Sequence, residues 1–293
     1  MLEEKKELMH SVRQQRIALN TASQVADTLY TKQKLAAGDM AIALRSGGYL
    51  AKETATVLGD LYKLTPREMA KNMRDGGYIA MSVAPKLREM GLNMNQAIVV
   101  LREVGYSASD VSFALKNVYS IWQVEDIIRE LNRAGYSPTE IALYARNVAN
   151  TPVHLVAEIF NKLGLPAKEA ARALSVAYDY ATQVMIAQAL KYAKYGAEQV
   201  AGAMEDLYHL TAEAMTDLFK KVGYTAAEVA NVMKNVYNKS AEWVAGALKS
   251  VYNLGGEAVE GILKGVGYAA DQIKNAMKSA FDWIEKNLNP LNW

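Results

Sequence analysis

Gly-Tyr pairs recur along the chain at a nearly constant spacing, and this period limits the fold more than any other feature. Between Gly48 and Gly164 the successive intervals are 29, 28, 30 and 29 residues. A fixed period of about 20 to 50 residues is typical of repeat proteins, whose units pack only against their neighbours. The pairs are Gly48-Tyr49, Gly77-Tyr78, Gly105-Tyr106, Gly135-Tyr136, Gly223-Tyr224 and Gly267-Tyr268, with Gly164-Leu165 in the same role.

A second copy of the pattern, without the glycine, lies between successive pairs, as at Lys63-Leu64-Thr65-Pro66. The elementary unit is therefore about 14 to 15 residues long, and two units form one repeat of about 29 residues. The segment from Gly223 to Tyr237 shows how a unit works. Gly223 suits the left-handed conformation that ends a helix, and Thr225 with Glu228 forms a capping box at the start of the next one.

Apolar residues then follow at helical spacing, because Val229, Met233 and Val236 recur at positions i, i+4 and i+7. Each unit is thus predicted to be one amphipathic helix of about 10 to 12 residues, a length that is marginal alone in water. The same box is expected at Thr65/Glu68, Ser107/Asp110 and Ser137/Glu140, and Pro66, Pro138 and Pro152 follow their caps where proline is tolerated.

These units predict an all-α protein, an α-solenoid or superhelical array of about eight helix pairs. Residues 1–40 lack the unit pattern and are expected to form capping helices, residues 41–281 form the tandem repeats, and residues 282–293 form a C-terminal cap ended by Pro290. Two places disturb the rhythm. Pro85 falls inside a unit, which predicts a kinked or late-starting helix. The stretch near 179–196 is about two residues longer than a normal unit. This extra length predicts an extended helix, a change in the superhelical path or a break between subdomains.

Composition excludes several classes of site. The chain has no cysteine, and His10, His154 and His209 lack the spacing of metal ligands. No phosphate-binding loop, nucleophile elbow or glycosidase-like acid pair is present. We therefore expect no enzyme activity, no cofactor and no metal site. Without a signal peptide or a membrane-spanning segment, the default location is the cytoplasm, with leaderless export left open.

The most regular chemical feature is a basic residue at the twelfth position of most units. In a solenoid these side chains form a row that could follow a phosphate backbone. The alternative, which we favour, is that they complement the helix macrodipole, because acidic residues such as Glu53 and Glu68 occupy the opposite helix ends. The row consists of Arg74, Arg88, Arg102, Lys116, Arg146, Lys220, Lys234, Lys249, Lys264 and Lys278.

Aromatic residues are abundant, with 17 Tyr against 4 Phe. The tyrosines lie mainly at the starts and ends of units, in phase with the apolar positions, which favours packing between helix ends over a stacking surface for bases. Trp122 and Trp243 lie at irregular positions. An exposed tryptophan at such a position is a better anchor for a partner than any of the periodic tyrosines.

One short segment resembles a known family. Leu64-Thr-Pro-Arg-Glu-Met69, followed by Gly76-Gly77, is similar to the start of a repeat in the transcription-activator-like DNA-binding arrays of bacterial effectors. The likeness covers a handful of residues, the period here is shorter, and the following units do not keep the base-reading loop. No base-reading residue is therefore assigned.

The favoured function is that of a non-enzymatic scaffold that binds another macromolecule. We expect this partner to be a protein. The near-neutral charge of +2 and the absence of active-site chemistry support this hypothesis. The first alternative is sequence-tolerant nucleic-acid binding through the basic row. A further alternative is a secreted or injected protein that acts on membranes or associates end to end, because the units from Ala241 to Phe281 are rich in small residues.

Overall fold

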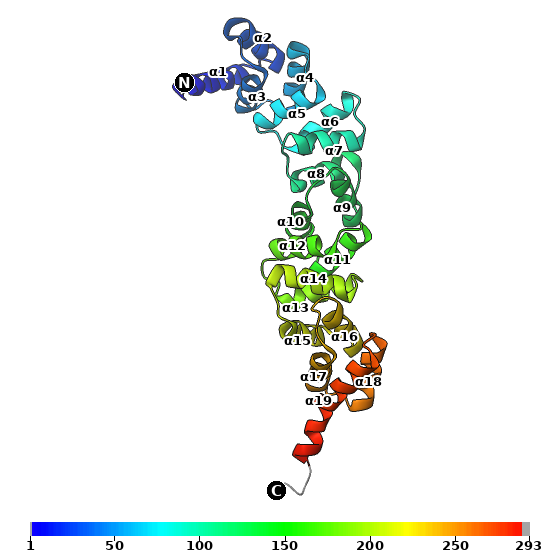
Figure 1. Ribbon diagram of the computed structural model, residues 1–293. Helices are drawn as coiled ribbons and strands as arrows, with labels where there is room; N and C mark the ends of the chain where they lie inside the picture. Colours follow the sequence, from blue (N-terminus) through cyan, green and yellow to red (C-terminus); the bar gives the residue numbers. More distant parts are fainter. Residues whose placement is uncertain (1, 289–293) are drawn as a thin grey trace. The chain divides into compact units, whose positions relative to one another are not determined.

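The computed structural model describes the backbone of residues 2–288 and the side chains of residue 4 and residues 6–281. Within residues 2–288 it contains nineteen α-helices and no strand (Figure 1). Neighbouring helices pack in chain order, which confirms the predicted all-α helical repeat array. The chain divides into two compact units, Met1–Ala149 and Asn150–Trp293.

In the first unit, each helix from α2 onward packs against the next one, and each helix, including α1, packs against the one after that. Odd-numbered helices therefore stack on odd-numbered ones (α1, α3, α5, α7, α9), and even-numbered helices on even-numbered ones. Its helices are α1 (Leu2–Ile17), α2 (Ala22–Gln33), α3 (Ala37–Ser46), α4 (Ala51–Tyr62), α5 (Pro66–Asp75), α6 (Ala80–Glu89), α7 (Met94–Glu103), α8 (Ala108–Tyr119), α9 (Val124–Arg133) and α10 (Pro138–Asn147).

The second unit repeats this two-row packing, with α11, α13, α15, α17 and α19 in one row and the even-numbered helices in the other. Its helices are α11 (Val153–Lys162), α12 (Ala167–Ala177), α13 (Gln183–Tyr192), α14 (Ala197–Tyr208), α15 (Ala212–Val222), α16 (Ala226–Asn235), α17 (Ala241–Tyr252), α18 (Gly256–Gly265) and α19 (Ala270–Leu288).

The predicted capping boxes are confirmed, and Pro66 and Pro138 are the first residues of α5 and α10. Pro152 is the N-cap residue of α11, which begins at Val153, so its prediction as a first helical residue was wrong. Thr225 accepts a hydrogen bond from the Glu228 backbone N–H at 3.3 Å, while the Glu228 carboxylate accepts one from the Thr225 N–H at 2.7 Å. Gly223 has a φ of +83°, the left-handed region that favours glycine. Capping boxes also form at the three other predicted sites. A box at Thr21/Gln24, which the sequence analysis overlooked, shows that α2 begins like a repeat helix.

The core depends on a buried residue, most often alanine, at the fifth position of each helix from α2 to α17. In α16 this residue is Ala230, fully buried between Val229 and Met233. The position faces the helix after next: a Cβ added to Gly76 at the end of α5 would lie 2.8 Å from the Cβ of Ala41 on α3. The fifth residues are Ala26, Ala41, Ala55, Ala70, Ala84, Ile98, Ser112, Ile128, Ala142, Ala157, Ala171, Ala187, Ala201, Thr216, Ala230 and Ala245, all buried.

The pattern changes in the last two helices, where the fifth residues are Glu260 on α18 and Lys274 on α19. Both side chains are exposed. A charge at this position cannot be buried without a partner, so α18 and α19 present a polar face where earlier helices pack on a successor. The predicted cap at 282–293 lies beyond the described side chains, and Pro290 and Trp293 lie outside the described residues altogether.

The two expected irregularities take specific forms. Helix α6 runs through Pro85 and begins at Ala80, in register with the other helices, so the prediction of a late start was wrong. Helix α12 has eleven residues and α13 keeps ten, and the connection between them, 178–182, is as long as those before α11 and α17. The predicted extended helix near 179–196 is therefore not found. The boundary between the two compact units falls elsewhere, after Ala149.

Candidate functional site

Half of the basic row lies against the helix after next. Lys234 on α16 donates from Nζ to the carbonyls of Val266 and Gly267, at 2.6 and 2.7 Å, and lies 4.9 Å from the ring centroid of Tyr268. Arg102 on α7 donates to the Gly135 carbonyl at 3.0 Å in the same way. These cations meet the negative end of a helix dipole, two helices ahead in the stack.

Three further residues of the row lie against the helix after next. Lys220 donates to the Val251 carbonyl and Lys249 to the Ala280 carbonyl. The guanidinium of Arg74 lies beside Gly105, where an added Cβ would be 3.0 Å from Cζ. Lys191, which the sequence analysis did not select, makes the same contact with Val222 and Gly223.

The other five basic residues are placed differently. Arg88 lines a hollow at the end of α8 with Tyr119, and Lys264 lines one on α18 and α19 with Lys274. Lys116 and Arg146 are half-buried, and Lys278 is exposed. Contact of any of these residues with phosphate or a partner stays a prediction.

Replacing Lys234 with methionine tests whether the row stabilises the stack. We expect the free energy of unfolding to fall by about 1 to 2 kcal/mol, because two hydrogen bonds to backbone carbonyls and a cation–π contact are lost. The measurement is urea unfolding followed by circular dichroism. Lys221→Met is the matched control, since Lys221 is exposed on α15, and an equal effect of the two substitutions would contradict the role of Lys234.

A tyrosine ladder joins the repeats at the same edge. In the first unit, Tyr49 donates from Oη to the Asn20 carbonyl at 2.8 Å, and Tyr78 donates to the Tyr49 carbonyl at 3.1 Å. Tyr106 and Tyr136 continue the series at 2.6 and 2.8 Å. Burial raises the pKa of each of these hydroxyls. The periodic tyrosines therefore fasten each repeat to the one before it.

The two tryptophans selected from the sequence differ in their surroundings. Trp122, in the connection between α8 and α9, is 64% exposed. Trp243 is half-buried on α17, and its indole Nε1 donates to the Glu213 carboxylate on α15 at 3.3 Å. The Lys239 ammonium lies 5.0 Å from the Trp243 ring centroid. Trp243 thus forms part of a surface built by two stacked helices.

That surface is a groove of about 410 Å³ between α15 and α17, called here the α15/α17 groove. It is hollow because α17 carries Gly246 and Ala247 where a larger side chain would fill the space; a Cβ on Gly246 would meet no atom within 4 Å. The groove is lined by Glu213, Thr216, Asp217, Glu242, Trp243, Gly246, Ala247, Ser250 and Val251.

Three carboxylates surround the groove. The pKa of Glu213 is lowered, first by the hydrogen bond from its own backbone N–H and then by those from Thr211 and Trp243. Asp217 and Glu242 are exposed, and neither forms an ion pair within the described part of the chain. With an indole wall and a small apolar floor, the groove suits a positively charged group on an aliphatic stem.

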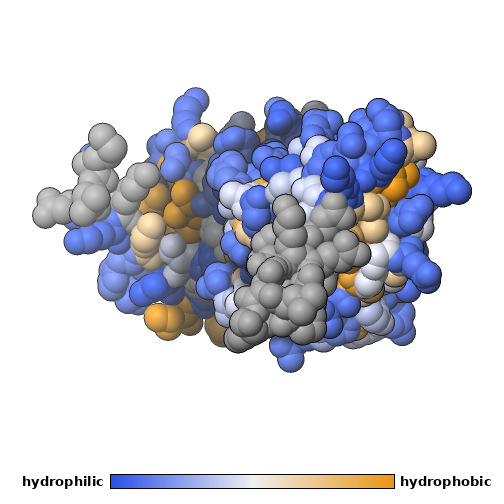
Figure 2. All heavy atoms as spheres, turned by 60° about the horizontal axis from the view of Figure 1, so that its bottom comes forward, coloured by the Kyte–Doolittle hydropathy of each residue, from blue (hydrophilic) through white to orange (hydrophobic). Residues whose placement is uncertain are grey.

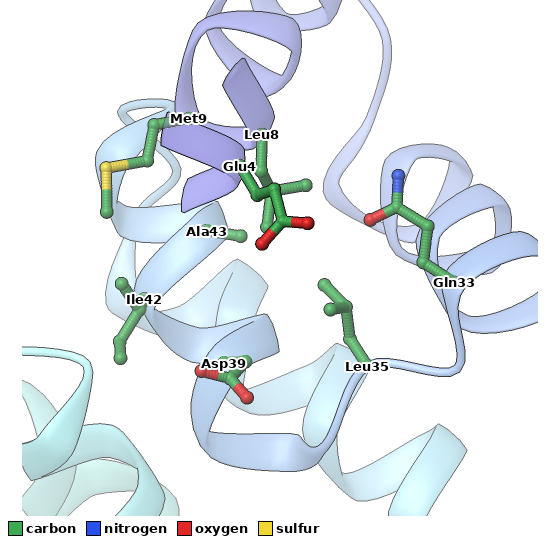
Figure 3. Close-up of a pocket in the computed structure, with 8 residues that line it drawn as sticks. All are labelled: Glu4, Leu8, Met9, Gln33, Leu35, Asp39, Ile42 and Ala43. Atoms are coloured by element: carbon green, nitrogen blue, oxygen red, sulfur yellow. The ribbon is translucent and has the colours of Figure 1, made fainter. Parts of the chain in front are cut away.

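A second hollow of about 240 Å³ lies in the first unit, among α1, α3 and the connection before α3 (Figure 3). The Glu4 side chain and Leu35 point into the same space, with Asp39 at its border. Its lining contains no aromatic or basic residue. The hollows beside Tyr119 and Tyr268 have basic residues in their linings. The α15/α17 groove combines a tryptophan with three carboxylates and has no basic lining residue, and we therefore take it as the candidate site.

Figure 2 shows one side of the molecule, where hydrophilic residues predominate and hydrophobic ones form separate patches. Among the described residues, no group of three or more His, Asp or Glu side chains is arranged to hold a metal ion. No helix in the described part of the chain combines the length and the apolar character needed to span a bilayer.

Comparison with protein-family models and with curated proteins finds no match for this chain. The site is therefore argued from its own residues. Trp243 was selected from the sequence, whereas Glu213, Asp217 and Gly246 were not. The sequence did contain a signal for this site. When α15 and α17 are aligned by their N-caps, Glu213 and Glu242 both fall at the second helical position, and the small residues Gly246 and Ala247 follow one turn later in α17.

Proposed function

We propose that this protein is a non-enzymatic helical-repeat scaffold that binds another protein, and that the α15/α17 groove receives a positively charged segment of that partner. The observation that carries this proposal is the convergence of Trp243 with the carboxylates of Glu213, Asp217 and Glu242 around one hollow. Aromatic anchors bordered by charge are typical of the sites where binding energy concentrates.

The groove can accommodate both the aliphatic stem and the charged head of a lysine or arginine side chain. Its aliphatic stem packs on Ala247, Val251 and the Trp243 ring, and its charged head lies between Asp217 and Glu242. The position of Lys239 over the indole supports this arrangement, because the ring already attracts a cation of the protein itself. A neighbouring basic residue of the partner can reach Glu213.

A protein partner is favoured over nucleic acid by the contacts of the basic row. Arg102, Lys220, Lys234 and Lys249 donate to backbone carbonyls of this chain. Donors used in this way contribute less to phosphate contacts, and the carboxylates of the α15/α17 groove repel a polyanion. A gel-shift titration over ionic strength, in which nucleic acid binds tightly at low salt, would contradict this preference.

The test uses a fluorescein-labelled peptide of alternating lysine and alanine, with a glutamate–alanine peptide as its counterpart. We expect the lysine peptide to bind and to change the fluorescence anisotropy, and the glutamate peptide not to bind. In the double variant Asp217→Asn/Glu242→Gln we expect affinity for the lysine peptide to fall by about tenfold, because two close charge pairs are lost.

Two controls make the result specific. Trp243→Ala is expected to weaken binding, whereas Trp122→Ala, at the more exposed tryptophan, is expected to leave it unchanged. The circular dichroism spectra and melting temperatures of all variants are compared first. Equal binding of the lysine peptide by the wild-type chain and the double variant would refute the assignment of the α15/α17 groove.

A further inference from the structure

Four aliphatic side chains gather at one edge of the first unit, where the tyrosine ladder begins. Leu19 precedes Asn20, Leu50 follows Tyr49, and Ile79 follows Tyr78, so each adjoins one step of the hydrogen-bonded series. Their exposed fractions are 90%, 66% and 51%, and nearby Ile17 is 73% exposed. We call Ile17, Leu19, Leu50 and Ile79 the aliphatic edge.

These residues occupy positions that hold capping residues or glycine in other repeats. Leu50 and Ile79 occupy the positions before α4 and α6 that hold Thr21 before α2 and Ser107 before α8, and their side chains make no capping hydrogen bond. Leu19 has a φ of +63°, a left-handed conformation that Gly48 and Gly77 provide in the next repeats. In three successive repeats, an exposed aliphatic residue thus occupies a position where a capping residue or a glycine would be more favourable for the local backbone.

The edge is also positively charged. The Arg16 guanidinium lies 4.6 Å from the ring centroid of Tyr49, and that of Arg45 lies 5.3 Å from the ring centroid of Tyr78. A third cation, Arg13, reaches the same edge and donates to the Ser46 carbonyl at 2.9 Å. One carboxylate, Glu53, lies among these cations, 3.4 Å from the Arg16 guanidinium.

We propose that the aliphatic edge binds an anionic phospholipid surface. Stacked helices lie about 8 to 10 Å apart, so the aliphatic side chains are separate protruding tips and not the wall of a groove. A fluid lipid interface accommodates such tips without matching their shape, and anionic headgroups complement the flanking cations. The resulting attachment is peripheral and reversible, because it depends on a few side chains and on charges screened by salt.

The test is co-sedimentation of the full chain with vesicles of phosphatidylcholine alone and of phosphatidylcholine with about 30 mol% phosphatidylglycerol, at low and high salt. We expect binding to the anionic vesicles at low salt, and less at high salt. The variant Leu50→Ser/Ile79→Ser is expected to lower the partition coefficient about tenfold. Its fold should be retained, because serine is a preferred capping residue at both positions.

The matched control is Trp122→Ser/Val176→Ser, which removes two apolar residues of similar exposure, 64% and 59%, away from the aliphatic edge. This variant should bind anionic vesicles like the wild-type chain. The proposal is overturned if the wild-type chain stays in the supernatant with anionic vesicles at low salt. It is equally overturned if the serine double variant, shown by circular dichroism to be folded, sediments as fully as the wild type.

Discussion

The Ala230→Glu substitution is expected to destabilise the second unit by on the order of 4 kcal/mol. Ala230 is fully buried at the fifth position of α16, the position that faces the helix after next. A carboxylate there loses its hydration, and its volume separates α16 from α18. The nearest cation along the helix, Lys234, is already bound to the Val266 and Gly267 carbonyls. Since a domain is typically stable by only about 5 to 15 kcal/mol, this loss removes a large part of its stability.

The control lies on the same helix. Ala227, the second residue of α16, is exposed, so Ala227→Glu adds the same charge without burying it. It also lies in the first turn, where a negative charge complements the helix dipole. We expect a change within about 0.5 kcal/mol, measured by urea unfolding. Similar effects of the two substitutions would contradict the claim that the fifth position carries the stack.

Raising the pH above 10 is expected to unfold the chain cooperatively. Burial raises the pKa of Tyr144 and of Tyr195 to about 12, and it also raises the pKa values of the tyrosines in the ladder. Below pH 10 these hydroxyls are protonated in both states. Between pH 10 and 12 the unfolded chain releases protons that the folded chain retains, so stability falls as the pH rises. Each unit of pKa difference corresponds to about 1.4 kcal/mol, and several tyrosines contribute.

The measurement combines circular dichroism at 222 nm with phenolate absorbance at 295 nm. We expect a steep rise in absorbance that coincides with the loss of helix, because unfolding exposes the buried tyrosine hydroxyls. Complete ionisation of all tyrosines with an unchanged helical signal would show that their hydroxyls do not stabilise the stack.

Much of the fold could be predicted because helix ends are determined by local chemistry. Thr225 and Glu228 pair because they lie only three positions apart in the sequence. Gly223 adopts its left-handed conformation because it lacks a Cβ. The fifth-position pattern was equally available, since alignment of the units by their capping residues places Ala245, Glu260 and Lys274 in one column. In α18 and α19 the residue in this column is charged and exposed.

The site could be predicted only in part. The charge of Lys234 indicated a role at a helix end, but its partners Val266 and Gly267 lie 32 and 33 residues further on. Which carbonyl it reaches depends on how α16 stacks on α18, and this is a property of tertiary packing. The α15/α17 groove has the same origin, because Glu213 and Trp243 meet only when their helices are in register.

Hydrogen–deuterium exchange of Ala230→Glu, read by mass spectrometry against Ala227→Glu, tests most directly whether each helix is held by its immediate neighbours. Nearest-neighbour stacking predicts that protection is lost most in α16 and α18, less in α14, and not at all in α2 to α8. A uniform loss across the described helices of both units, or equal protection in the two variants, would contradict it.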